Sequence, residues 1–284
     1  MSMKLGFHVS IQDGVDRAVD RADAISCTTF QIFTQSPRMW RHRELREEEV
    51  KRFKYKLQET GIDPVFSHMP YLPNLSTPDP VNYRKSVETL TAEVAKCNQL
   101  GVRYLVTHLG SHLGSGTERG MERIVEALNH VNAVFDETPI ILLENTSGKT
   151  NEVGSTFNEI SRIIEKVESD RVGVCLDTCH AYTRGYDIAT QRGLAEALDE
   201  LDSYVGLGRL YLVHLNDARD TLGSRLDRHE HIGLGKIGEE GFRVILNSVL
   251  REVPIVMETP MDERRTDVDN MRKAMELAGL EVDK

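Results

Sequence analysis

Eight short apolar runs recur along the chain, and a longer segment with helical spacing of its apolar residues separates each run from the next. The runs are rich in β-branched residues: LGFHV (5–9), TFQIF (29–33), PVFSH (64–68), RYLVTH (103–108), PIILLE (139–144), VGVCLD (172–177), RLYLVH (209–214) and PIVMET (254–259). Continuous apolar strands that alternate with amphipathic helices are typical of a parallel sheet covered by helices. This alternation limits the fold to a closed barrel or a doubly wound open sheet.

Helix start signals and chain length favour the barrel. Asp79 and Pro80 form a helix start signal, and Thr156 with Glu159 has the spacing of a capping box. Eight strand–helix units in 284 residues agree with the roughly 250 residues typical of a (β/α)8 barrel. The segment GFHVSIQDG lacks the glycine pattern that follows the first strand of a dinucleotide-binding open sheet. We therefore expect a single α/β domain over residues 1–284, a (β/α)8 TIM barrel with its active site at the C-terminal rim of the strands.

Composition narrows the cellular setting. No stretch reaches the roughly 18 consecutive apolar residues of a membrane-spanning helix, and the first ten residues lack the layout of a signal peptide. The four cysteines are too few for a disulfide scaffold and none lies in a CxxC pair. We expect a cytoplasmic protein with no membrane partner. The net charge of −10 is the opposite of a typical nucleic-acid binder, unless bound metal ions add positive charge at the site.

Polar residues stand at the ends of six consecutive apolar runs, the third to the eighth. In a barrel these side chains would meet at the C-terminal rim, where barrel enzymes place their active sites. Three further candidates lie close by in the sequence, one just after the sixth run and two in the long loop after the seventh. The nine residues are His68, His108, Glu144, Asp177, His180, His214, Asp227, His229 and Glu258.

Histidine and carboxylate side chains together indicate a metal centre. Imidazole nitrogen and carboxylate oxygen are the ligands of zinc and similar transition metals, whereas calcium and magnesium sites are nearly all oxygen. A single histidine at a strand end is more often a hydrogen-bonded structural residue, but unpaired charges that converge on one rim would be destabilising without a metal. Nine side chains are too many for one ion and indicate two or three ions that share carboxylates. Metals about 3.5 to 4 Å apart suit in-line displacement at phosphorus, so phosphodiester hydrolysis is the favoured chemistry.

Several sequence words resemble one protein family. They are LENTSG (143–148), CLDTCHAYTRGYD (175–187), HLNDAR (214–219), DRHEHIGLGKIG (227–238) and METP (257–260). Together they are similar to motifs of the endonuclease IV family of apurinic/apyrimidinic endonucleases, in the same order and over nearly the full chain. The resemblance implies three zinc ions per chain. Mn²⁺ or Fe²⁺ would also suit some of these sites, since they share nitrogen and oxygen ligands.

The resemblance also implies which residues hold each ion. His68 and His108 would hold the first ion, and Glu144 would bridge it to the second. Asp177, His214 and Glu258 would complete the second site. His180, Asp227 and His229 would hold the third ion.

The implied reaction is hydrolysis of the phosphodiester 5′ to an abasic site in double-stranded DNA, which leaves a 3′-hydroxyl and a 5′-deoxyribose phosphate. Removal of blocking groups from 3′ ends is expected as well. Glu144 would be the catalytic residue that positions the attacking hydroxide and accepts its proton. The loops FTQSPRMW (33–40) and HMPYLPN (68–74) resemble the DNA-penetrating loops of the family, which implies DNA contacts for Arg38, Tyr71 and Leu72. We expect a monomer.

Other polar residues have more modest expected roles. His231 stands where the family pattern has Asn, and His8 and His112 are expected to support ligands or phosphate from a second layer. Trp40 is expected to anchor its loop. Cys175 is expected to point into the barrel, and Cys179 is not expected to bind metal. Basic loop residues are expected to provide a local positive face for DNA, namely Arg38, Arg184, Arg219 and Arg228.

A metal-dependent sugar isomerase or epimerase on the same type of barrel is the alternative. Such enzymes also place histidine and carboxylate ligands at strand ends, around one or two ions. The triad of His180, Asp227 and His229 would have no purpose in a one-metal isomerase. A non-catalytic damage-binding barrel would have an incomplete ligand set, whereas the set here is complete.

Overall fold

All eight apolar runs form strands of one parallel sheet in the computed structural model, which describes residues 3–40, 43–137 and 139–281. The neighbouring order is β1-β10-β7-β6-β5-β4-β3-β2. The strands are β1 (Leu5–Phe7), β2 (Phe30–Ile32), β3 (Val65–His68), β4 (Tyr104–His108), β5 (Ile140–Glu144), β6 (Val172–Asp177), β7 (Leu210–His214) and β10 (Ile255–Met257). Every neighbouring pair in this order is parallel, as the alternation of runs predicts.

The sheet closes on itself between β1 and β2, so the barrel predicted from the sequence is confirmed. His8 and Gln31 form a parallel bridge across this seam, and the N–H of Val9 donates to the Gln31 carbonyl oxygen at 2.8 Å. A Cβ atom at Gly6 would lie 1.7 Å from the carbonyl oxygen of Thr29. Glycine at position 6 is therefore what allows the two strands to approach.

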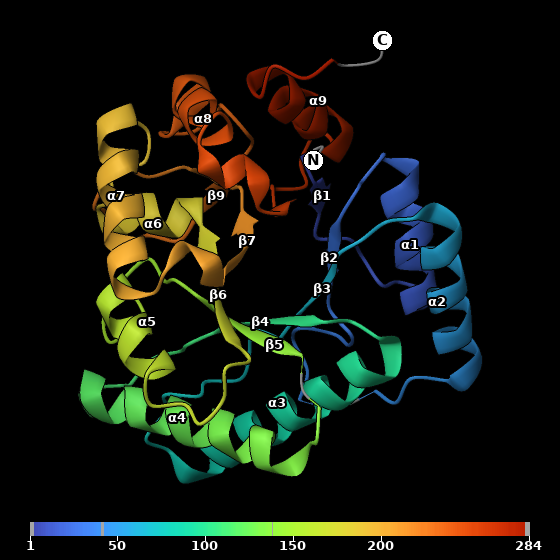
Figure 1. Cartoon of the computed structure of the whole chain (residues 1–284), viewed down its shortest axis with the longest axis vertical. Helices are drawn as coiled ribbons and strands as arrows, with labels where there is room; N and C mark the ends of the chain where they lie inside the picture. The colour runs from blue at the N-terminus through green and yellow to red at the C-terminus, as the bar shows by residue number, and fades with distance from the viewer. Residues whose placement is uncertain (1–2, 41–42, 138, 282–284) are drawn as a thin grey trace.

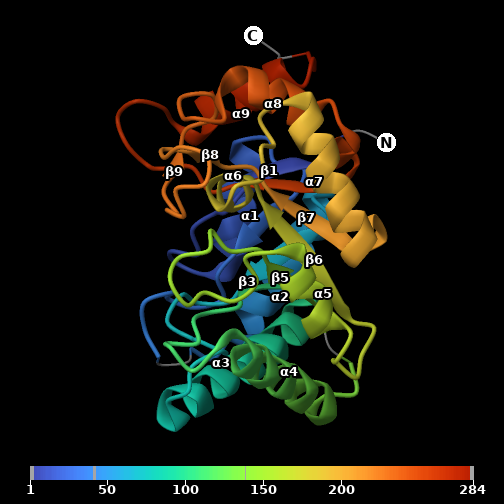
Figure 2. The same ribbon diagram turned by 90° about the vertical axis from the view of Figure 1, so that its left-hand side faces the viewer.

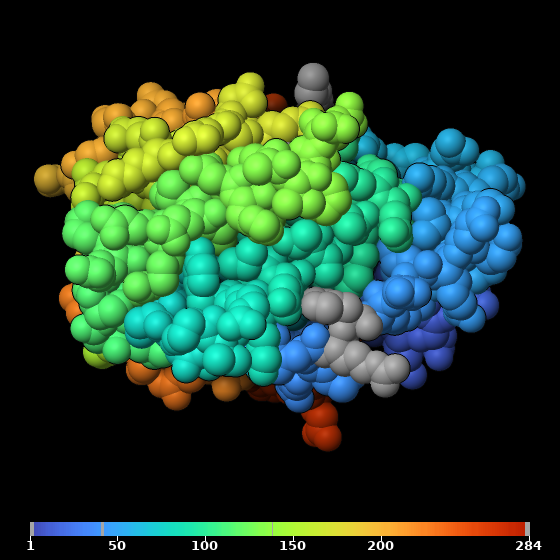
Figure 3. All heavy atoms as spheres, turned by 90° about the horizontal axis from the view of Figure 1, so that it is seen from below, coloured from blue at the N-terminus to red at the C-terminus, as the bar shows by residue number. Residues whose placement is uncertain are grey.

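Helices form a ring around the strands (Figure 1). They are α1 (Val15–Ala24), α2 (Glu47–Thr60), α3 (Pro80–Leu100), α4 (Thr117–Val134), α5 (Phe157–Ile164), α6 (Thr178–Arg184), α7 (Gln191–Tyr204), α8 (Gly238–Leu246) and α9 (Asp267–Leu277), with short 3-10 turns at Leu207–Arg209 and Val249–Glu252. Seen from below, the teal-to-green segment that includes α3 and α4 forms the middle of the surface, with the blue segment of α1 and α2 beside it (Figure 3). Among the described helices, none is both long enough and apolar enough to cross a membrane.

The regular alternation is broken at two places that matter for the site. Both α6 and α7 follow β6, and a two-stranded antiparallel hairpin of β8 (Asp217–Ala218) and β9 (His229–Glu230) follows β7. Figure 2 shows β8 and β9 on the same side of the barrel as the yellow-green loop between β5 and α5. These additions extend the carboxyl-end face of the barrel.

The two helix start signals behave differently. The Asp79 side chain caps α3 by accepting hydrogen bonds from the N–H groups of Val81 and Asn82. Thr156 caps α5 by accepting from the N–H of Glu159, but the Glu159 carboxylate does not return the bond. It accepts instead from the N–H groups of Gly154 and Ser155, at 2.8 and 2.9 Å, because the tight turn before the helix leaves those donors unpaired. Only half of the predicted capping box therefore forms.

An apolar layer fills the barrel beneath its carboxyl-end rim. Six consecutive strands of the closed sheet each contribute one fully buried side chain to this layer: Phe66, Val106, Leu142, Cys175, Leu212 and Val256. Cys175 thus points into the barrel, as predicted, and burial raises the pKa of its thiol to about 12. Side chains two residues apart on a strand point to the same face. The next inward position along each strand is therefore the predicted polar residue, directly above the apolar layer.

Outside the barrel, one buried carboxylate ties α1 to α2. Glu49 is fully buried, and its Oε1 accepts hydrogen bonds from the Val15 N–H and from Arg43 Nη2, both at 2.7 Å. Burial alone would raise the pKa of this carboxyl, but these hydrogen bonds lower it below its ordinary value. Glu49 therefore acts as a cap for α1 supplied by a residue on α2.

We predict that Glu49→Gln lowers the free energy of unfolding by about 1–3 kcal/mol, because a charged acceptor for two donors is lost. Because the folded-state pKa is lowered, the stabilisation is present above the ordinary value of 4.5 and disappears as the pH falls further. Urea unfolding of both proteins at pH 7 and pH 4 measures this. Glu48→Gln is the matched control, since Glu48 is an exposed neighbour that forms a surface ion pair with Lys51. Equal stability of the Glu49 variant and wild type at pH 7 would refute the assignment.

Candidate metal centre

Each of the eight strands places one polar side chain in a ring above the apolar layer. The ring consists of His8, Gln31, His68, His108, Glu144, Asp177, His214 and Glu258. Six of these residues are strand-end candidates from the sequence, and His8 is one of the expected supporting residues. Gln31 is missing from the sequence-based set because an amide is not a typical metal ligand. The alternation of the second run puts Gln31 on its inward face, but nothing in that run indicates which residues the amide contacts.

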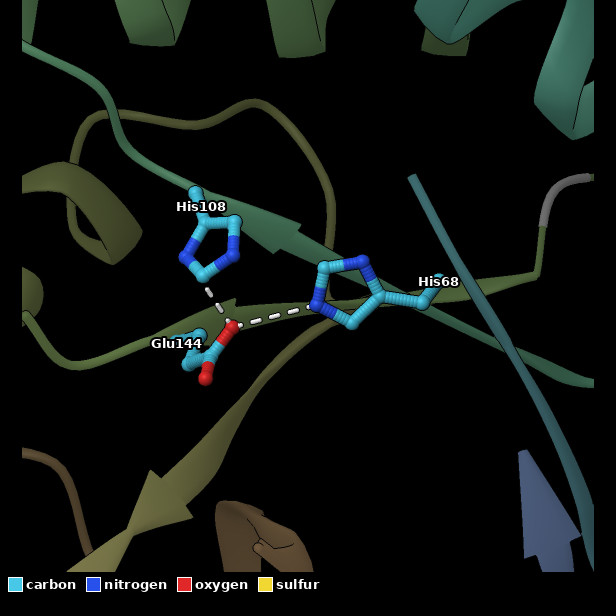
Figure 4. A group of neighbouring side chains, drawn as sticks. All are labelled: His68, His108 and Glu144. Atoms are coloured by element: carbon cyan, nitrogen blue, oxygen red, sulfur yellow. Dashed lines mark hydrogen bonds and ion pairs between the residues drawn. The ribbon is translucent and has the colours of Figure 1, made fainter. Parts of the chain in front are cut away.

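The first group consists of His68, His108 and Glu144, from β3, β4 and β5. Glu144 Oε2 lies 3.3 Å from His68 Nε2 and 3.2 Å from His108 Nδ1. Both imidazole rings point toward this carboxylate from neighbouring strands (Figure 4). The three candidate ligand atoms lie within 4.8 Å of one another, which is close enough to hold one ion.

The second group consists of Glu144, Asp177, His214 and Glu258, and it shares Glu144 with the first. His214 Nδ1 lies 3.1 Å from Glu144 Oε1, 3.5 Å from Glu258 Oε2 and 3.9 Å from Asp177 Oδ2. The other oxygen of Glu144 faces the first group. A bridging carboxylate between two ions is thus compatible with the geometry.

The third group consists of His180, Asp227 and His229, at the outer edge of the site. Asp227 Oδ1 lies 3.1 Å from His180 Nε2 and 3.5 Å from His229 Nε2. His180 lies in α6, and its own N–H donates to Oδ1 of Asp177, the N-cap residue of that helix and a member of the second group, at 2.8 Å. His229 lies in β9, so the hairpin after β7 brings the third group to the rim.

Cys179 lies beside the third group without belonging to it. Its sulfur is close enough to Asp177 and His229 to form an alternative set of ligands. The thiol donates instead to the carbonyl oxygen of Arg228 at 3.7 Å, and burial raises its pKa. A thiol held protonated in this way is a poor metal ligand.

Most of the histidines use one ring nitrogen for a hydrogen bond to the protein and leave the other facing the carboxylates. Nδ1 of His68, His180 and His229 lies 2.6, 2.9 and 3.1 Å from the backbone oxygens of Met69, Asn145 and Glu258. His214 has the opposite arrangement, with Nε2 bonded to the protein and Nδ1 facing the carboxylates. Metal-binding histidines are oriented in this manner.

The electrostatics of the rim call for added positive charge. Burial alone would raise the pKa of Glu144 and of Glu258, yet the neighbouring imidazoles lower both pKa values well below their ordinary range. Burial would lower the pKa of both His180 and His214. The carboxylates of Asp177 and Asp227 raise the pKa of His180, and Cys175 together with Glu258 and Glu144 raises that of His214. The pKa shifts of these histidines and carboxylates thus favour opposite charges side by side on the rim.

One atom tests directly whether these residues suit a metal. His229 Nε2 is buried and has no hydrogen-bond partner among the described residues, although it lies 3.5 Å from Asp227 and 3.7 Å from Asp177. A buried polar atom without a partner is unfavourable. A cation between this nitrogen and the two carboxylates would satisfy all three, so the donor set fits a transition metal.

The residues expected to contact DNA lie around the same rim. Tyr71 and Leu72 are 56% and 39% exposed, large values for apolar side chains, and Arg38 is also exposed. The Tyr71 ring lies 5.9 Å from the ring of His108. The N–H of Tyr71 donates to the Pro37 carbonyl oxygen at 3.2 Å. This bond joins the loop after β3 to the loop after β2.

Three of the other loop residues named in the sequence analysis order the loops around the site. Trp40 is anchored to α3 by Lys85, whose Nζ lies 5.7 Å from the indole centroid. His112 Nδ1 accepts from the N–H groups of Gly114 and Gly116 and so orders the loop before α4. His231 is fully buried and bonds to Asp262 and Asn270, which holds β9 against the loop after β10.

The basic loop residues are only partly free to face a ligand. Arg228 forms a bidentate ion pair with Asp220, and Arg219 lies 3.6 Å from Glu230. Arg184 donates to the hydroxyl of Ser155. The local positive face expected from the sequence is therefore weakened by neighbouring carboxylates.

Known proteins are similar to this chain in sequence and in fold. Residues 19–279 match a family described as the xylose isomerase-like TIM barrel. The probable endonuclease 4 of Methanoculleus marisnigri is 49% identical over 278 residues, which cover 97% of this chain and 99% of the relative. That of Cenarchaeum symbiosum is 49% identical over 281 residues, with 98% and 100% covered. The crystal structure of endonuclease IV from Thermus thermophilus superposes with a TM-score of 0.86 at 39% identity, covering 97% of this chain and 99% of that one.

Proposed function

The chain belongs to the endonuclease IV family, and on this premise we propose that it is a DNA-repair enzyme that acts at abasic sites. Its reaction would be hydrolysis of the phosphodiester 5′ to the abasic nucleotide in double-stranded DNA, leaving a 3′-hydroxyl and a 5′-deoxyribose phosphate. Removal of blocking groups from 3′ ends would use the same site. The enzyme would act as a single-domain monomer in the cytoplasm.

The observation that carries this proposal is the arrangement of nine ligand-type side chains in three adjoining groups on one rim. Their mixed nitrogen and oxygen donors suit three zinc ions, with His68, His108 and Glu144 at the first, and Asp177, His214 and Glu258 joining Glu144 at the second. His180, Asp227 and His229 would hold the third. Bound zinc would supply Lewis acidity that stabilises the negative charge developing on phosphate and makes water ionise near neutral pH.

Glu144 is the proposed catalytic residue. Its carboxylate is 1% exposed and is shared between the first and second groups. Its two oxygens lie 3.3 Å from His68 Nε2 and 3.1 Å from His214 Nδ1, and the neighbouring imidazoles lower its pKa, which favours the ionised form. An oriented, ionised carboxylate can position the attacking water and accept its proton.

Recognition of the abasic nucleotide is assigned to Arg38, Tyr71 and Leu72. An unpaired abasic nucleotide is easier to extrude from the helix than a stacked one, and inserted apolar side chains kink a duplex. Tyr71 and Leu72 are exposed beside the first group, and the bond between Tyr71 and Pro37 holds their loop to the one that carries Arg38. These three side chains are therefore placed to fill the gap left by the missing base.

The third group argues against a sugar isomerase or epimerase on this barrel. His180, Asp227 and His229 have no role in a site with one or two ions. They nevertheless lie together, and among the described residues the buried Nε2 of His229 has no hydrogen-bond partner. They would stabilise the leaving oxygen through a third ion in phosphodiester cleavage.

The deciding experiment uses a labelled duplex that contains one tetrahydrofuran abasic analogue, which lacks the aldehyde needed for β-elimination. We predict a single nick 5′ to the analogue with a 3′-hydroxyl end, and about three zinc ions per chain by elemental analysis of the same sample. An undamaged duplex of the same sequence is the control. No nick by fully metallated protein would refute the proposal and would direct the search to sugar substrates.

We predict that Glu144→Gln lowers kcat by about 10²- to 10⁴-fold, because the amide cannot accept the proton. Circular dichroism should show an unchanged fold. Asp177→Asn should likewise abolish most cleavage by weakening the second group. Glu118→Gln removes a carboxylate that pairs on the surface with Arg162 and should leave kcat unchanged. Normal turnover by the Glu144 variant with its metals bound would contradict the assigned role.

We predict that Tyr71→Ala weakens binding to the abasic duplex by about 1–2 kcal/mol, roughly tenfold, which is the size of a stacking contact. Affinity for undamaged duplex should change little. Fluorescence anisotropy with labelled duplexes measures both affinities. The wild-type and variant enzymes are first treated with a chelator so that they bind DNA without cutting it. Tyr55→Ala is the matched control because Tyr55 is 61% exposed on α2. An equal loss of affinity in both variants would exclude a specific role for Tyr71.

A further inference from the structure

The side chain of Gln31 lies between two members of the second group. Gln31 is fully buried in β2. Its Oε1 lies 2.9 Å from His214 Nε2, and its Nε2 lies 2.8 Å from Glu258 Oε1. The same Nε2 lies 2.9 Å from Nδ1 of His8. One amide thus contacts His214 and Glu258 of the second group. It also contacts His8, the residue that follows β1 in the polar ring.

Hydrogen-bond chemistry allows only one orientation of this amide. A carboxylate only accepts, so the Gln31 atom facing Glu258 must be the NH₂ group. Its two hydrogens then go to Glu258 Oε1 and to His8 Nδ1. The remaining amide atom, Oε1, only accepts, so His214 must carry a proton on Nε2. The reversed amide would place two acceptors together at Glu258, the amide oxygen and the carboxylate oxygen.

This orientation determines how both residues face the second group. With Nε2 of His214 protonated and bonded to Gln31, the lone pair on Nδ1 faces Glu144, Asp177 and Glu258. With Oε1 of Glu258 occupied by the amide, Oε2 is the oxygen directed at His214 Nδ1. His214 is held by a side-chain amide, whereas one ring nitrogen of each of three other histidines lies against a backbone oxygen. These histidines are His68, His180 and His229.

The backbone of Gln31 keeps the amide in place. Gln31 pairs with Phe66 of β3 on one side and forms the bridge to His8 on the other. Its carbonyl oxygen accepts from the N–H of Val9 at the seam where the barrel closes. A residue fixed between two strands has little freedom to reorient, so its amide is preorganised.

We propose that Gln31 is a positioning residue for the second metal site, one that selects the Nδ1-ligating form of His214 and directs a single oxygen of Glu258 toward the ion. This inference rests on the proposed function, because it assumes that the second group binds zinc. It adds to that function a residue that acts through two of the proposed ligands, His214 and Glu258.

The test compares zinc retention by wild type, Gln31→Leu and Gln35→Leu, all purified as zinc-loaded full chains. Gln35 is the matched control because it is also a buried glutamine near the end of β2, but its Oε1 accepts from Lys96, at 2.6 Å, and not from a proposed ligand. Titration with a chromophoric chelator measures the affinity for zinc. One zinc ion of Gln31→Leu should be bound about 10- to 100-fold more weakly than in wild type. Gln35→Leu should retain its zinc like wild type.

Two further readouts separate positioning from a general loss of structure. Excess zinc should restore much of the lost kcat of Gln31→Leu, with KM for the abasic duplex little changed, because the defect is in metal occupancy. In ¹⁵N-histidine-labelled wild type loaded with zinc, long-range ¹H–¹⁵N correlation spectra should show His214 protonated at Nε2. If Gln31→Leu does not fold, Gln31→Met is used for the zinc titration.

Several results would overturn the inference. Equal zinc retention by wild type and the Gln31 variants would do so, as would His214 protonated at Nδ1 in the wild-type spectrum. Equal losses in the Gln31 and Gln35 variants would indicate a general structural defect and would also overturn it. Failure of the proposed function looks different, since wild type itself would then hold no zinc or leave the abasic duplex uncut.

Discussion

Repulsion among carboxylates gathered on one rim is the constraint on which the rest of this structure depends. Glu144, Asp177 and Glu258 share one small space, and Asp227 lies at its edge. Ionised carboxylates in such a space are strongly unfavourable without compensating positive charge. The imidazoles of His180 and His214, whose pKa values are raised, can offset part of that charge, and divalent cations would supply the rest. The chemistry of the site and its stability are therefore two consequences of the same charge arrangement.

The barrel makes this gathering of charge possible by simple strand geometry. Each strand alternates its side chains between the inside and the outside, so the apolar layer of Phe66, Val106 and Leu142 leads directly to the polar ring two residues further on. The apolar layer excludes water from below, and the loops surround the ring from above. A rigid floor of this kind holds the ligands in fixed positions, whereas residues on flexible loops would not stay within bonding distance.

The parts of the protein that follow from periodicity can be predicted from its sequence, whereas those that follow from three-dimensional neighbours cannot. His68, His108 and Glu144 could be identified because parallel strands all end on the same face of a barrel. Gln31 could not, because an amide becomes important only through the residues that strand pairing brings beside it. The hairpin that carries His229 is expected as a loop, since two-residue strands leave no periodic signal. The Glu159 side chain bonds to the turn before its helix because that turn has unpaired donors, which no local pattern reveals.

The shared position of Gln31 at the seam and at the metal groups has a consequence for how the protein matures during synthesis. The first group draws on residues 68 to 144 and can assemble once half of the chain has left the ribosome. The second group needs contacts between residues that are 227 positions apart, Gln31 and Glu258. These contacts form only after the last strand is inserted and the barrel closes. Binding of an ion by the second group would therefore be a late event, because it would follow closure of the barrel.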